Sequence, residues 1–117
     1  MPATPNPFLE LAWHELSAAI PVALQDFPRL SAVRLSDGVW KIESGGACLK
    51  IELLGLEDEI RVTRTIPSGM STECVYRVTC MRPNLPLLLD RAGNLSLPVL
   101  VLQELFESLA EGSNPTH

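Results

Sequence analysis

The feature that most constrains the fold is a block of alternating apolar and polar residues over residues 32–66. The alternation is clearest in Ala47–Leu54, where Leu49, Ile51 and Leu53 fall on one side of an extended chain. A period of two is typical of strands that are covered on one face. Turn-forming residues at 36–38, 44–46 and 55–58 separate the runs and indicate hairpins. The block therefore predicts an antiparallel meander covered on one side.

Two segments with helical periodicity flank this block. The first is predicted to run from about residue 7 to residue 20 or a little beyond, with Asn6 as N-cap and Pro7 at the first position. Its apolar residues recur at spacings of three and four: Leu9, Ala12, Trp13, Leu16, Ala19, Ile20 and Ala23. Pro21 is expected to end or kink this helix. The second helix is predicted over residues 98–111, with Gly112 beyond its end.

The segment between the meander and the last helix contains further strand signals. Residues 72–81 are predicted as a strand, with a short helix as the alternative. Residues 87–89 and 95–97 are predicted as the arms of a hairpin. The whole chain, 1–117, is expected to form one α+β domain. It would contain an antiparallel sheet of five to seven strands with the two helices mainly on one face, and disordered ends at 1–6 and 113–117.

The net charge of −5 is distributed unevenly. Residues 1–28 and 95–117 each carry three acidic residues and no Lys or Arg, so residues 29–94 sum to +1. This balance argues against nucleic-acid binding, which needs basic residues opposite phosphates. Acidic ends would suit a basic partner, or would simply keep a small domain in solution.

The cysteines and the apolar runs indicate a compartment. Cys48, Cys74 and Cys80 have no metal-type spacing, which favours free thiols in a reducing environment. No apolar run approaches the roughly 18 residues of a membrane span, and the first residues lack a signal-peptide layout. We therefore expect a cytoplasmic protein with no membrane association.

Residues that could carry chemistry are sparse. The chain has no paired histidines, no CxxC and no Gly-rich phosphate loop. His14 lies one helical turn after Glu10, which favours a solvated surface pair. Cys48 would need an oriented base, and His14 is the one candidate, so Cys48 is predicted to be a small strand residue. The sequence thus predicts no enzyme, no metal and no cofactor.

The last helix carries more apolar surface than one packing face uses. Its apolar residues cover roughly half of the circumference, whereas a surface helix needs a stripe of about 100°. The surplus would be buried by a homodimer, by a bound partner or within the monomer. The predicted contact residues are Val101, Leu105 and Leu109 with Leu100 at the rim. An acidic ridge is predicted on the opposite side, formed by Glu104, Glu107 and Glu111.

Two arginines are candidates for a second contact. Arg61 and Arg77 are predicted to lie side by side on the exposed sheet face, where they would bind a carboxylate or phosphate. Cross-strand pairing with Glu52 or Glu73 is the commoner arrangement.

In its overall profile the chain resembles the chaperones of bacterial type III secretion effectors. The similar stretches are residues 8–24, 33–66 and 86–109, and the best local match is residues 95–98 leading into 105–109. The resemblance implies a homodimer that holds an effector's extended N-terminal segment against apolar patches without ATP hydrolysis. That family usually places a dimer-forming helix mid-chain, where residues 71–81 favour a strand.

The leading hypothesis is a non-enzymatic protein-binding protein of the secretion-chaperone kind. It would bury a partner's apolar segment against the sheet or helices, with strand addition at a sheet edge as one mode. The alternative is an immunity protein or antitoxin that neutralises a basic toxin through its acidic ridge.

Overall fold

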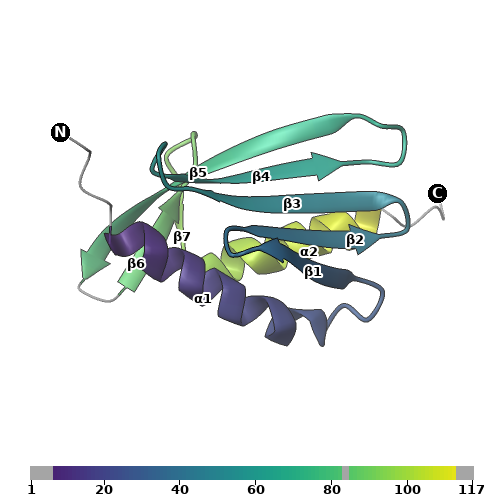
Figure 1. The fold of residues 1–117 in the computed structure, drawn as a ribbon, viewed down its shortest axis with the longest axis horizontal. Coiled ribbons are helices and arrows are strands. Elements are labelled where there is room, and N and C mark those ends of the chain that lie inside the picture. The colour runs from purple at the N-terminus through teal and green to yellow at the C-terminus, as the bar shows by residue number, and fades with distance from the viewer. Residues whose placement is uncertain (1–6, 83–84, 113–117) are drawn as a thin grey trace.

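The computed structural model describes residues 7–82 and 85–112 (Figure 1). Two helices enclose seven strands along the chain, which confirms the predicted α+β fold. The elements are α1 (Pro7–Leu24), β1 (Ser31–Ser36), β2 (Val39–Ser44), β3 (Ala47–Leu54), β4 (Glu59–Thr65), β5 (Ser71–Arg82), β6 (Leu85–Leu89), β7 (Leu95–Ser96) and α2 (Pro98–Gly112). The disorder predicted for residues 1–6 and 113–117 falls outside the described residues.

The strands form one sheet in the order of the sequence, β1 to β7, and every neighbouring pair is antiparallel. The strand prediction for residues 72–81 is confirmed, because β5 pairs with β4 from Ser71↔Thr65 to Arg77↔Glu59. The predicted last hairpin is also present as β6 and β7. A meander of this kind leaves β1 at one edge and β7 at the other.

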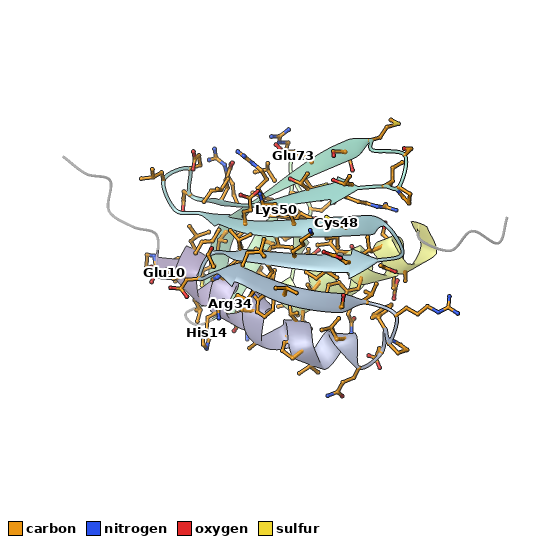
Figure 2. The ribbon with its side chains drawn as sticks, turned by 45° about the vertical axis from the view of Figure 1, so that its right-hand side comes forward. Glu10, His14, Arg34, Cys48, Lys50 and Glu73 are labelled. Carbon is orange, nitrogen blue, oxygen red and sulfur yellow. The ribbon has the colours of Figure 1, made fainter. Side chains whose placement is uncertain are left out.

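Both helices cover the same face of the sheet. The register places Ile42, Leu49, Ile51, Ile60 and Val62 on one face, and all five are buried. The helices pack on this face and on each other. In Figure 2 the strands lie in front of α2, and Lys50, Cys48 and Glu73 are labelled on the open face. The one-sided cover expected from the alternation is therefore present.

The core joins the two helices through aromatic and aliphatic side chains. Leu16 and Ile20 of α1 and Leu102 and Phe106 of α2 are at most 1% exposed. The ring of Phe27, just after α1, meets Phe106 edge-to-face with centroids 5.9 Å apart. Burying each such side chain stabilises the fold by roughly 1.5–3 kcal/mol.

Helix α1 continues through Pro21 to Leu24. The helix therefore runs a little beyond residue 20, as expected, and of the two effects predicted for Pro21, an end or a kink, it does not end there. Pro21 is exposed, whereas Ile20 and Ala23 beside it are buried in the core. Their burial offsets the missing backbone bond, and the carbonyl of Ser17 loses the donor that a residue other than proline would supply.

Neither described helix is long and apolar enough to cross a membrane.

Candidate partner-binding site

Most of the apolar side of α2 is buried within the protein's own core. Val101 and Leu109 are 4% and 0% exposed, and Leu105 is half-buried against the same core. The prediction that these residues contact a partner is therefore wrong for Val101 and Leu109. The cause is the packing of α2 against α1, β3 and β6, which buries the surplus within the monomer, one of the three alternatives left open by the sequence. Leu100 is exposed, and its predicted place at the rim of a partner contact stays a prediction.

The acidic ridge of α2 faces solvent. Glu104 and Glu107 are exposed, while the side chain of Glu111 is not among those described. Burial raises the pKa of Tyr76 on β5 to about 12, and electrostatic repulsion from the acidic groups of Cys74, Asp90 and Glu104 adds to this shift. The helical layer thus presents carboxylates, because neither α1 nor α2 contains Lys or Arg.

Arg61 and Arg77 lie on the open face, but Arg61 is already paired. Its guanidinium lies 3.5 Å from the Glu59 carboxylate and 3.7 Å from that of Glu73. The register places Arg61 opposite Val75 and Arg77 opposite Glu59, so the two arginines are diagonal neighbours. Arg77 is exposed, and no ion pair of it is found among the described residues. Cross-strand pairing with Glu73 is confirmed, and it opposes a joint anion site.

His14 and Cys48 are far apart in the architecture. His14 is exposed on α1, on the covered side of the sheet. Cys48 pairs with Thr65 in β4 and lies on the open face. All three cysteines are free thiols. Within residues 7–82 and 85–112, no group of His, Cys, Asp or Glu is arranged to hold a metal ion.

The outer edge of β1 is open. Within the described chain, β2 is the one strand that pairs with β1. Every residue of β1 except Ala32 is exposed, and both Val33 and Leu35 retain 55% of their accessible surface. A row of unpaired backbone N–H and C=O groups on such an edge is a template for another strand.

A groove of about 620 Å³ runs beside this edge, between α1 and the β1–β2 hairpin. One wall is a stripe of α1 that includes Glu10, His14, Ser17 and Pro21. The other lining residues are Trp13, Ala18, Arg34, Trp40 and Leu53. Figure 2 labels Glu10, His14 and Arg34, which gather where α1 passes the sheet edge.

Two indole hydrogen bonds hold the walls of the groove together. The Nε1–H of Trp13 donates to the carbonyl of Asp37 at 3.0 Å, which ties α1 to the β1–β2 turn. The Nε1–H of Trp40 donates to the hydroxyl of Ser17 at 3.1 Å, which ties β2 back to α1. The groove is therefore preorganised, because its two walls cannot separate without breaking these bonds.

Arg34 stands at the mouth of the groove in a fixed position. Its Nε–H donates to the carbonyl of Ser36 at 3.3 Å, and Nη2 donates to that of Asp37 at 3.0 Å. The guanidinium carbon lies 5.6 Å from the ring centroid of Trp40, within cation–π range. No carboxylate among the described residues pairs with it. Arg34 is thus a positioned cation that has no counter-ion in the described part of the chain.

The edge and the groove were missed by sequence reasoning. Alternation predicts that Val33 and Leu35 belong to a strand, but it does not tell an edge strand from a central one. Trp40 fell within an expected strand, and Trp13 within an expected helix stripe. One signal in the sequence could have indicated the α1 wall of the groove. The apolar spacing on either side of Pro21 is uninterrupted, which indicates a helix that continues through the proline.

A scan against protein-family models, a search of curated proteins and a search of solved structures each find no match to this chain. The resemblance to type III secretion chaperones therefore stays a prediction. What can be inferred about function comes from the open edge, the groove and the charges around them.

Proposed function

We propose that this protein is a non-enzymatic protein-binding protein that holds an extended segment of a partner as an added strand beside β1. The observation that carries the proposal is the unpaired edge of β1, with Val33 and Leu35 both 55% exposed. In strand addition, backbone hydrogen bonds supply affinity and side-chain pockets supply specificity. The groove beside α1 is a pocket in the right place for the second role.

The composition of β1 supports this reading. Proteins usually protect an edge strand with several charges, a proline or a covering loop. β1 has no proline, and Arg34 is its one charged residue; its one irregularity is a register shift against β2 between Arg34 and Ser36. The two exposed apolar side chains would be a liability in a protein without a partner at this edge.

A secretion chaperone is the class of protein that this binding mode favours. Holding an extended segment is what the resemblance to type III secretion chaperones implies, and a secreted effector would be the partner. The dimer-forming helix of that family has no counterpart here, since residues 71–81 belong to β5. The proposal accordingly depends on the β1 edge and requires no dimer.

The test is affinity capture from the source organism with matched variants. The native protein should recover a partner that the double variant Val33→Lys/Leu35→Lys loses, because two lysines on the edge oppose strand addition. Leu56→Lys is the control, since Leu56 is fully exposed in the β3–β4 turn, away from the edge. Equal recovery by all three proteins would exclude the edge as the binding site.

Hydrogen exchange on the purified complex gives an independent readout. Backbone amides on the outer side of β1 should become protected when the partner binds, while the exposed β3–β4 turn should not change. Protection confined to α2 would instead point to the helical layer.

The helical layer supports a second candidate, an immunity protein or antitoxin that neutralises a basic toxin. The supporting observation is that α1 and α2 contain no Lys or Arg, while Glu104, Glu107 and Leu100 are exposed on α2. Such a complex would form by charge complementarity and would weaken steeply with salt. Binding at the β1 edge, with its backbone hydrogen bonds, should tolerate salt better.

A further inference from the structure

The groove beside β1 lies where it would meet the side chains of an added strand. Residues directly opposite each other in paired strands point to the same face, with Cβ atoms about 4.5–5.5 Å apart. Arg34 is opposite Trp40 in β2 and shares its face, because both side chains line the groove. A partner residue opposite Arg34 on the outer side would therefore also point toward α1.

The chemistry of Arg34 determines what that partner residue should be. Two of its N–H groups are engaged by the carbonyls of Ser36 and Asp37, and the remaining donors have no described acceptor. Its position is fixed by these bonds and by the Trp40 ring, so a carboxylate would meet a preorganised donor set. A lysine opposite it would be repelled.

The next residue on the same face would enter the apolar part of the groove. Alternate residues of a strand are separated by about 6.8 Å. Toward the β1–β2 turn the groove is lined by Trp13, Trp40 and Leu53, and Leu53 is held there because its N–H donates to the carbonyl of Gly38 at 2.8 Å. Glu10 on the α1 wall disfavours a second carboxylate at this position.

From this placement we infer that the groove selects partner segments that carry an Asp or Glu two residues away from a large apolar side chain. The carboxylate would pair with Arg34, and the apolar side chain would pack in the groove against Trp40, on the strand next to β1. The inference rests on the proposed strand addition at β1 and specifies the partner sequence that this edge accepts.

The experiment is a selection from a library of displayed random peptides against the purified protein. Peptides recovered with the native protein and lost with Val33→Lys/Leu35→Lys are those that bind the edge. We expect this set to be enriched in an acidic residue two positions from an apolar or aromatic one. In the same set, Arg34→Glu should weaken binding of an acidic peptide by about tenfold or more, and should favour the matched peptide with Lys in place of the acid.

Three outcomes separate the inference from the proposed function. Edge-dependent peptides with the acidic–apolar pattern, and a preference reversed by Arg34→Glu, support both. Edge-dependent peptides without that pattern, or with a preference that Arg34→Glu leaves unchanged, overturn the inference and leave the edge site standing. A library that yields no edge-dependent peptide overturns both. Circular dichroism and tryptophan fluorescence of each variant check that the fold is retained, and Arg34→Gln repeats the test with a neutral side chain should Arg34→Glu fail to fold.

Discussion

Trp40 donates its indole N–H to the hydroxyl of Ser17 across the boundary between the sheet and helix α1. The bond joins residues 23 positions apart in the chain, and it lies in the wall of the groove beside β1. Together with the bond from Trp13 to Asp37, it makes α1 and the β1–β2 hairpin one rigid frame. The open edge of β1 thus belongs to a hairpin that α1 holds in place.

Removing the Ser17 hydroxyl should destabilise the protein through Trp40. In Ser17→Ala the indole N–H loses its acceptor, and leaving such a group unsatisfied costs about 1–3 kcal/mol. The free energy of unfolding in urea measures the change. In a Trp40→Phe background the same substitution should have almost no effect, because the donor is already absent. Equal losses in the two backgrounds would show that the bond does not contribute.

Arg64 should stabilise the C-terminal end of α2. Its Nη1 donates to the Ser108 hydroxyl at 2.6 Å and its Nη2 to the Ser108 carbonyl at 3.1 Å, where the helix dipole favours a cation. Arg64→Met should lower the free energy of unfolding by about 1.5–3 kcal/mol. The exposed Arg77 is the matched control, and Arg77→Met should change stability by less than about 0.5 kcal/mol. The reverse ranking in thermal denaturation would contradict this role.

Leu109 and Leu100 should differ sharply as alanine variants. Leu109 is fully buried, so Leu109→Ala should cost about 2–5 kcal/mol through lost burial and a cavity. Leu100 is 48% exposed, so Leu100→Ala should remain within about 0.5 kcal/mol. Urea denaturation of the two variants, monitored by circular dichroism, compares them directly. Similar costs would mean that α2 does not pack as described.

Tyr76 provides a pH-dependent test, because it is the one tyrosine in the chain. Its pKa is raised to about 12 in the folded protein, above the value of about 10 for an exposed tyrosine. The native state therefore holds the phenolic proton more tightly. The resulting stabilisation is complete below about pH 10 and is lost as the pH rises toward 12. Absorbance of tyrosinate follows the titration, and Tyr76→Phe should abolish both the absorbance change and this part of the pH dependence. A transition near pH 10 in the folded protein would contradict the burial of Tyr76.

Local pattern was enough to predict the strands and their pairing. The alternation in Ala47–Leu54 and the short turns on either side of it leave few other arrangements, so the meander and its covered face followed. The loop between β6 and β7 could also be predicted from local sequence. There Asp90 accepts hydrogen bonds from the backbone N–H groups of Ala92 and Asn94, as aspartate commonly does in turns.

The candidate site could not be predicted in the same way, because it depends on which elements meet. The apolar surplus of α2 was visible in the sequence, but whether α1 or a partner covers it is a question of packing between the two ends of the chain. The position of Val33 on an edge depends equally on what does not pair with β1. Arg34 is a candidate contact residue because the Trp40 ring and the carbonyl of Asp37, in the turn between the two strands, hold its guanidinium in place.

The contact between α1 and α2 has a consequence for how the protein matures. The sheet pairs each strand with the one made just before it, so most of it can assemble as the chain leaves the ribosome. Helix α2 follows all seven strands in the chain (Figure 1) and is made after them. Its Phe106 and Leu102 belong to the same buried core as Leu16 and Ile20 of α1. Until α2 is synthesised, the apolar face of the sheet lacks one of the two helices that cover it. The core of this protein is therefore completed only once its last element has been synthesised.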